Sequence, residues 1–392
     1  MNTSMRLAST VCVAATVAAV GTPAFAQSNF DVTFGGDAYF QGAYVDQRRD
    51  AGLRSTEFAS RYRLVITPTA TTDNGLEYGA RLRVVADSGD PSISTRNLSN
   101  DRAFIFANGA FGTVQAGTIN GLSDEYGNIG PNVEGVAGSP DSNGILFLNG
   151  SSTLSTLPLT ATSLRTLLAY DVGTKVIYIT PSFGGVQAAV SYTPRTDESN
   201  NSINRSRTDL LGAAPTFRDV VEFGAVYQGT FGEVGLEASA FYQTGRANRQ
   251  TDGILSQSFE DLRSLHVGTS LTFGDFKVGG SFAHSGKSGY ARDIADKRTQ
   301  TALILGAQYT MGPFLLAANY LRAQGNDVAT MSTPAKADIW QGGITWTIAP
   351  GLTTGLEYDY VRSTVSSGPL TAGGDDLNDR SHILMLDTRL AF

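Results

Sequence analysis

The chain has 392 residues, a formal net charge of −7 at pH 7, 41% hydrophobic residues and a single cysteine. The acidic balance argues against nucleic acid as a partner, because phosphate binding requires a clustered basic surface. Beyond residue 26 no segment approaches the roughly 18 to 20 consecutive apolar residues of a membrane-spanning helix, which excludes a helical membrane protein.

The first 26 residues have the form of an export signal. Arg6 supplies the positive start, residues 7–20 are apolar or small, and Ala24-Phe25-Ala26 is a small-x-small cleavage site. We therefore expect residues 1–26 to be a signal peptide and residues 27–392 to form one domain. Cys12 lies in the part that is removed, so no disulfide is available and a large fold must hold the mature chain together.

From Phe30 onward, apolar and polar residues alternate with a period of two in segments of roughly ten residues, the length at which a tilted strand crosses a bilayer. The pattern is clearest in residues 265–273, 340–348 and 352–360. A soluble β-sandwich also alternates, but its strands average about five or six residues. The alternation therefore predicts an all-β fold that spans a membrane.

Aromatic residues mark both ends of the expected strands. One set directly precedes a glycine at a short turn, and a second set lies near the opposite ends. Such paired belts are typical of the two membrane-water interfaces, because an aromatic ring is apolar in body and polarisable at the headgroup boundary. The first set is Phe111, Phe183, Phe231 and Phe273, and the second is Tyr44, Tyr192, Tyr242, Tyr320 and Tyr360.

The connections between the expected strands alternate between short and long. Short turns include Asn108-Gly109 and Gly274-Asp275, whereas residues 195–218 and 366–378 form long polar segments. Membrane barrels have this organisation, with short periplasmic turns and long outer loops. The pattern predicts about sixteen antiparallel strands, an even number that lets the barrel close without an exposed edge. The longest connection, approximately residues 119–164, is the third outer loop.

Three stretches resemble the general-diffusion porins of Gram-negative proteobacteria. Residues 32–45 (VTFGGDAYFQGAYV) resemble the first porin strand, and residues 102–117 (RAFIFANGAFGTVQAG) resemble the fourth and fifth strands with their turn. Residues 382–392 (HILMLDTRLAF) end in Phe392 with Leu390 on the same face, which resembles the terminal signal read by the barrel-assembly machinery. Thr388 departs from the pattern, since an apolar residue is more usual there.

This resemblance implies a homotrimer of barrels in the bacterial outer membrane, surrounded by lipid and lipopolysaccharide. In each barrel the third outer loop folds inward and narrows a water-filled channel, through which small hydrophilic solutes and ions diffuse passively. Such a protein is not an enzyme, so we expect no catalytic residue, no metal site and no cofactor. A loop as long as residues 119–164 is uncommon unless it has a function.

In a diffusion channel the residues that matter are charges that face one another across a constriction. Strand parity directs a group of arginines into the lumen, and the inserted loop carries acids that would stand opposite them. Asp37 also points inward, at a position where the family often has a basic residue. The hypothesised constriction comprises Arg61, Arg63, Arg81, Arg83, Arg102 and Asp37 on the wall, with Asp124, Glu125, Glu134 and Asp141 on the loop.

Other functions remain open at this point. A substrate-selective channel would differ only in a few constriction contacts. An outer-membrane barrel hydrolase would need a serine or an acid paired with histidine, for which His284 or His382 is available. A structural or adhesive barrel would have a plugged lumen, and its silence in a conductance measurement would distinguish it from a channel.

Overall fold

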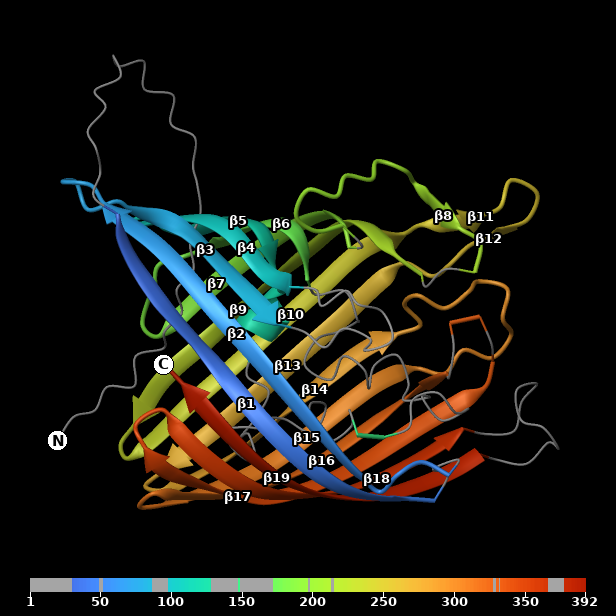
Figure 1. Cartoon of the computed structure of the whole chain (residues 1–392). Coiled ribbons are helices and arrows are strands. Elements are labelled where there is room, and N and C mark those ends of the chain that lie inside the picture. The colour runs from blue at the N-terminus through green and yellow to red at the C-terminus, as the bar shows by residue number, and fades with distance from the viewer. Residues whose placement is uncertain are drawn as a thin grey trace.

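Sixteen strands close into one antiparallel barrel in the computed structural model of the chain (Figure 1). The structure describes residues 30–48, 52–86, 98–127, 147–148, 172–196, 198–212, 215–326, 329–330, 332–365 and 377–392. The expected signal peptide, residues 1–26, lies outside this part. The barrel strands are β1 Asp31–Gln47, β2 Thr56–Thr71, β3 Glu77–Ala86, β4 Leu98–Gly109, β5 Gly112–Ile119, β6 Gly173–Ile179, β7 Val186–Arg195, β9 Phe217–Phe231, β10 Val234–Ala247, β13 Leu262–Phe273, β14 Phe276–Gly286, β15 Gln300–Met311, β16 Phe314–Asn326, β17 Pro334–Ala349, β18 Leu352–Val365 and β19 Leu377–Ala391.

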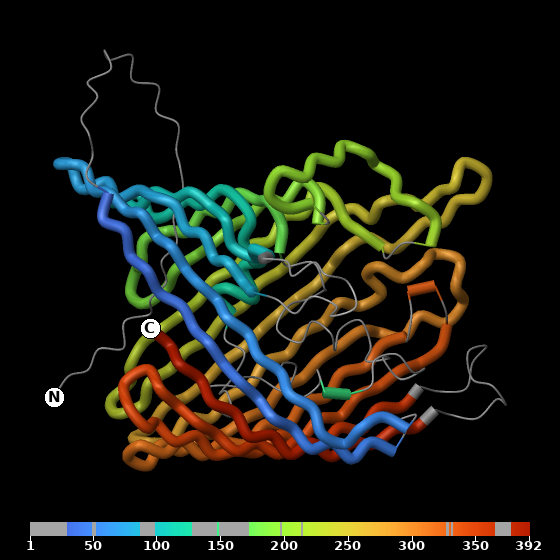
Figure 2. The backbone as a smooth tube through the Cα atoms, in the orientation of Figure 1, coloured from blue at the N-terminus to red at the C-terminus, as the bar shows by residue number. Residues whose placement is uncertain are grey.

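The first and last strands join to close the ring, as Figure 2 shows where β1 runs beside β19. Their pairing extends from Asp37 opposite Ala391 to Gln47 opposite Ser381. At the end of this seam, the amide of Gly36 donates to the carbonyl of Phe392 at 2.9 Å, and the amide of Phe392 donates to the carbonyl of Gly36 at 3.1 Å. Because lipid offers no hydrogen-bonding partner to a free edge, this closure is what allows the sheet to sit in a membrane. The predicted all-β barrel is confirmed.

Short turns and long connections alternate along the barrel, as predicted, and define a turn end and a loop end. At the turn end, Gly274 follows Phe273 with φ +56°, a left-handed conformation that favours glycine. At the loop end, three short strands form a separate sheet that the sequence did not predict, in the order β12-β11-β8 (Figure 1). They are β8 Thr208–Leu210, β11 Arg249–Thr251 and β12 Ser256–Gln257. No helix in the described residues is long and apolar enough to cross a membrane.

The outer face of the barrel is apolar and carries aromatic clusters near both ends. Near the turn end, the rings of Phe276 and Tyr309 are 4.5 Å apart. Toward the loop end, Trp340 lies 5.2 Å from Tyr320 and 5.3 Å from Tyr360, between ring centroids. Two belts of this kind are the arrangement expected of strands whose ends lie at membrane-water interfaces.

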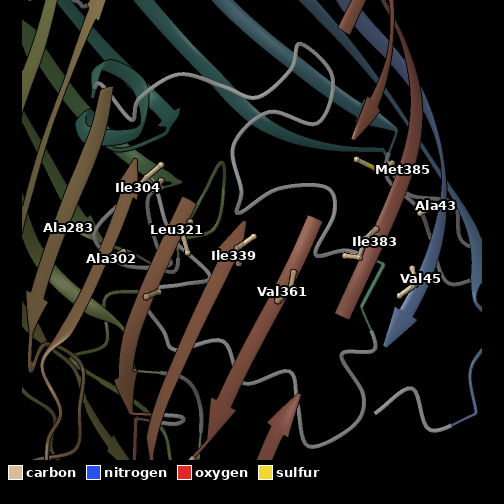
Figure 3. Packing of buried hydrophobic residues seen from close by; sticks show 11 residues of the cluster. Ala43, Val45, Ala283, Ala302, Ile304, Leu321, Ile339, Val361, Ile383 and Met385 are labelled. Atoms are coloured by element: carbon tan, nitrogen blue, oxygen red, sulfur yellow. The ribbon is translucent and has the colours of Figure 1, made fainter. Parts of the chain in front are cut away.

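Part of the inner face is apolar as well. Buried residues from β14 to β19 and from β1 lie side by side on the lumen side of the wall (Figure 3). We call this set the aliphatic strip. Phe147 and Leu148, from the long connection after β5, pack against it. The strip consists of Ala43, Val45, Ala283, Ala302, Ile304, Leu321, Ala323, Ile339, Val361, Ile383 and Met385.

Candidate channel constriction

Arginines from three neighbouring strands line one side of the lumen. Arg61 and Arg63 on β2 alternate with exposed outward residues such as Tyr62, which is 63% exposed. On β3, Arg81 and Arg83 occupy the inward positions, and the register pairs Arg83 with Arg102 on β4. Parity predicted the inward direction of Arg61, Arg63, Arg81 and Arg83, and the structure places Arg102 beside them; that they form the constriction stays a prediction. We call this group, together with Arg389 on β19, the basic wall.

Carboxylates within the basic wall pair with several of these arginines. Asp37 accepts hydrogen bonds from Arg63, whose Nε lies 2.9 Å from Oδ1, and Asp37 Oδ2 also lies 3.1 Å from Nη2 of Arg389. Asp101 pairs with Arg83 through a second two-point contact. Asp37 is thus a counter-ion inside the basic wall. Arg63 and Arg389 both pair with Asp37, which explains why an acidic residue occupies this position.

Sequence reasoning missed two members of this network. Arg389 could have been found by parity, because it occupies an inward position opposite Tyr39 in the seam between β1 and β19. Asp101 could not have been found by parity, because the pairing of β3 with β4 shifts register between Arg83 and Val84. Such a shift inserts an extra residue and redirects side chains locally.

Arg61 differs from the other arginines of the wall. Its guanidinium carbon lies 4.6 Å from the centroid of the Tyr39 ring, in a cation–π contact. Across the described ranges no carboxylate forms an ion pair with it. A cation held by an aromatic face keeps its full charge while its position is fixed. Arg61 is therefore a fixed positive charge on the lumen wall.

The beginning of the inserted loop is attached to the wall by polar contacts. The short helix α1, Leu122–Tyr126, follows β5 almost directly. Glu222 on β9 accepts hydrogen bonds from the amides of Leu122 and Ser123, at 2.7 and 2.8 Å. A carboxylate at this end of a helix satisfies amide groups that have no partner within the helix. Beneath α1 lies an apolar cluster that includes Ile119, Leu122 and Phe241.

The first loop acids lie beside the basic wall and do not face it from across the lumen. Arg102 Nη2 is 2.8 Å from Glu125 Oε2, and Arg102 Nη1 is 2.7 Å from Asn120 Oδ1. Asp124 accepts a hydrogen bond from Asn120. Glu125 therefore contacts the basic wall directly and does not face it from across the lumen, while α1 itself packs against β7, β9 and β10. Glu134 and Asp141 lie outside the described residues.

A second group of carboxylates lies buried on the inward side of β18 and β19. Glu357, Asp359 and Asp387 are each at most 3% exposed, and we call them the acidic wall. Glu357 Oε1 accepts a hydrogen bond from Gln341 at 2.9 Å. The alternation of residues 352–360 already placed two of these acids on the polar face, so the sequence held the signal. The two walls meet on β19, where Asp387 and Arg389 occupy successive inward positions.

Comparison with known proteins supports the reading of this lumen as a channel. A family model described as Gram-negative porin matches residues 9–366. A protein called porin from Fuscovulum blasticum is 25% identical over 287 residues, which cover 71% of this chain and 90% of that protein.

Solved structures show the same fold. The anion-selective porin from Comamonas acidovorans has 17% identity and a TM-score of 0.59, and the match covers 93% of this chain and all of that one, at 100%. The outer membrane protein OmpT of Vibrio cholerae, folded in vitro, has 13% identity and a TM-score of 0.58, and the match covers 92% of this chain and 97% of that one. The chain belongs to the Gram-negative porin family and forms an outer-membrane porin channel.

Proposed function

We propose that the channel passes small hydrophilic solutes and ions by passive diffusion, past a constriction whose two poles are the basic wall and the acidic wall. The basic wall contains six arginines, and three carboxylates pair with them, namely Asp37, Asp101 and Glu125. The observation that carries the proposal is the fixed, unneutralised charge of Arg61.

Charges in this arrangement act on solutes in two ways. The field between the two adjacent walls orients water and dipolar solutes, which disfavours apolar ones. It also separates ions, since anions are favoured beside the basic wall and cations beside the acidic wall. Two charges about 4 Å apart interact with roughly 1 kcal/mol in bulk water, and more strongly in a narrow lumen. Removing one charge should therefore change the anion-to-cation permeability ratio by about fivefold or more.

The reversal potential in a salt gradient tests this proposal. Arg61→Gln should shift the reversal potential toward cations, and Glu357→Gln should shift it toward anions. Arg205→Gln is a matched control, because this arginine is exposed on a long loop and loses the same charge. An unchanged reversal potential in Arg61→Gln, with normal single-channel conductance, would show that Arg61 does not line the ion path. Silence of the wild-type protein in planar bilayers would instead indicate a plugged barrel.

We further propose that the channel is a homotrimer, assembled through the wall around β5 and β6. These strands have 8 and 7 residues, fewer than the roughly nine to eleven that cross the hydrocarbon layer. Beside them, small outward residues on β4 and β5, Ala103 and Ala116, help to line a shallow groove of about 490 Å³ that extends over β2 to β5. A structural neighbour, OmpT of Vibrio cholerae, has been described in a trimer form. Ala103→Arg should lower the mass of the detergent-solubilised particle from three copies to one.

We propose that the protein catalyses no reaction. His284 and His382 lie at outward positions, and His382 Nδ1 is 2.7 Å from the hydroxyl of Tyr358. The absence of lipid or peptide hydrolysis by the purified protein would support this. We also propose that residues 1–26 are removed on export and that Phe392, which is 66% exposed, belongs to the barrel-assembly signal. Deleting Phe392 should reduce the amount of folded barrel in the membrane.

A further inference from the structure

Tyr39 on β1 lies on the inward side of the barrel with an arginine on either side. β1 pairs with β19 and with β2, and the two registers place Arg389 and Arg61 directly opposite Tyr39 (Figure 2). Tyr39 is 7% exposed, whereas the next residue, Phe40, is 54% exposed on the lipid side. The tyrosine ring is therefore part of the lumen wall, at the point where the basic wall crosses the seam.

The two arginines stand in equivalent positions but have different partners. Each is the cross-strand neighbour of Tyr39, and each is a diagonal neighbour of Asp37, which precedes Tyr39 by two residues on the same face. Diagonal neighbours of this kind lie within reach of long side chains. Arg389 makes use of this reach, since its Nη2 lies 3.1 Å from Asp37 Oδ2. Arg61 instead lies over the Tyr39 ring, with its guanidinium carbon 4.6 Å from the ring centroid.

The ring contact is what fixes the guanidinium of Arg61. Within the described ranges its Nε is buried and has no hydrogen-bond partner, and no carboxylate forms an ion pair with it. A cation over an aromatic face is attracted by the quadrupole of the ring, and the attraction is stronger where water is excluded. The ring therefore holds the position of Arg61 without neutralising its charge.

Asp37 is the alternative partner that Arg61 would find without the ring. Its carboxylate accepts from Arg63 on β2 and from Arg389 on β19. A carboxylate has about four acceptor sites, so Asp37 retains capacity for a further guanidinium. If Arg61 turned toward Asp37, as Arg389 does, its charge would be paired and the lumen would present less positive charge to a passing ion.

We propose that Tyr39 is a positioning residue for ion selectivity, which holds Arg61 on its ring and away from Asp37. This inference rests on the proposed function, in which the charge of Arg61 acts on ions in the channel. Tyr39 itself makes no contact with the permeating ion. It determines how much of the charge of Arg61 is available to anions, and so it sets the anion-to-cation permeability ratio through Arg61.

Reversal potentials of the full-length protein in a salt gradient test this inference. Tyr39→Leu removes the aromatic face and should lower the anion-to-cation permeability ratio by about threefold, less than the loss of the whole charge in Arg61→Gln. Tyr39→Phe keeps the ring and should retain the wild-type ratio. Tyr62→Leu is the matched control, because it makes the same substitution on the lipid side, where Tyr62 is 63% exposed. Single-channel steps of wild-type size identify variants whose barrel is intact.

Two double variants separate positioning from a general effect on the wall. In an Asp37→Asn background Arg61 has no carboxylate to approach, so Tyr39→Leu should change the ratio by less than about 1.5-fold. In an Arg61→Gln background, Tyr39→Leu should change nothing, because the residue through which Tyr39 acts is gone. An undiminished threefold change in either background would overturn the inference.

The single variants distinguish failure of the inference from failure of the proposed function. If Arg61→Gln shifts the reversal potential and Tyr39→Leu does not, Tyr39 does not position Arg61, while the proposed function stands. If Arg61→Gln itself has no effect, the proposed function fails and the inference fails with it. A shift in Tyr39→Phe equal to that in Tyr39→Leu would show that the ring face is not the cause, and an equal shift in Tyr62→Leu would also overturn the inference.

Discussion

The attachment of α1 by Glu222 gives a prediction whose size follows from the structure. Glu222 is 2% exposed, and its carboxylate accepts hydrogen bonds from the amides of Leu122 and Ser123. Hydrogen bonds to a charged group contribute about 1.5–3 kcal/mol each. Glu222→Gln keeps one acceptor oxygen but loses the charge and places an NH₂ group against an amide donor. We expect a loss of about 3 kcal/mol, or roughly 150-fold in the equilibrium between attached and detached helix.

Hydrogen-deuterium exchange measures this equilibrium directly. In Glu222→Gln, the peptide that contains residues 119–127 should exchange about 100-fold faster than in the wild-type protein, while peptides from β13 to β16 should not change. Glu233→Gln is the control, since Glu233 is an exposed glutamate in the short turn between β9 and β10. If exchange in residues 119–127 is the same in both variants, other contacts hold α1 and the argument from Glu222 is refuted.

Three further predictions concern other parts of the molecule. Replacing Phe147 and Leu148 by serine removes roughly 1–2 kcal/mol of apolar burial per residue from the aliphatic strip, so single-channel currents of the variant should fluctuate more than those of the wild-type protein; a variant trace as steady as the wild-type trace would contradict this. Gly274→Ala forces a left-handed φ of +56° on alanine and should cost about 1–2 kcal/mol in thermal unfolding, whereas Gly235→Ala, with ordinary φ, should cost less. Asp252 accepts hydrogen bonds from the amides two and three residues later, at 2.8 and 2.7 Å, which lower its pKa below the ordinary 3.8. The turn should therefore be most stable above pH 3.8 and loosen as pH falls through the lowered pKa, which amide chemical shifts would report; no change between pH 5 and 2 would contradict this.

The barrel and the orientation of its arginines could be predicted because lipid imposes a period of two on every strand. That period identifies the face on which a residue lies, as it did for Arg61 and Arg83. It does not say which neighbour a side chain meets, since this depends on the register between strands. The pairing of Asp37 with Arg63 requires that register, and the pairing of Asp101 with Arg83 requires the irregularity within it.

The loop-end features were harder to predict for a different reason. The small sheet joins β8 to β11 in parallel, from two connections that are separated by β9 and β10. Residues such as Leu210 and Gln250 carry no alternating pattern long enough to indicate a strand. The position of Glu125 depended on the direction in which the chain leaves β5, which composition does not encode. The inward direction of Glu357 and Asp359, by contrast, follows from the alternation of residues 352–360.

The seam between β1 and β19 has a consequence for biogenesis. Asp37 finds its strand partner at Ala391, so the ladder that completes the ring links the two extremes of the polypeptide. A ribosome must release almost the whole chain before that ladder can form. Contacts between such distant residues are slow to form. Until they form, the incomplete sheet exposes two unpaired strand edges that can hydrogen-bond to other chains. Truncation by even one strand at the carboxyl end should therefore yield an aggregating product and not a smaller pore.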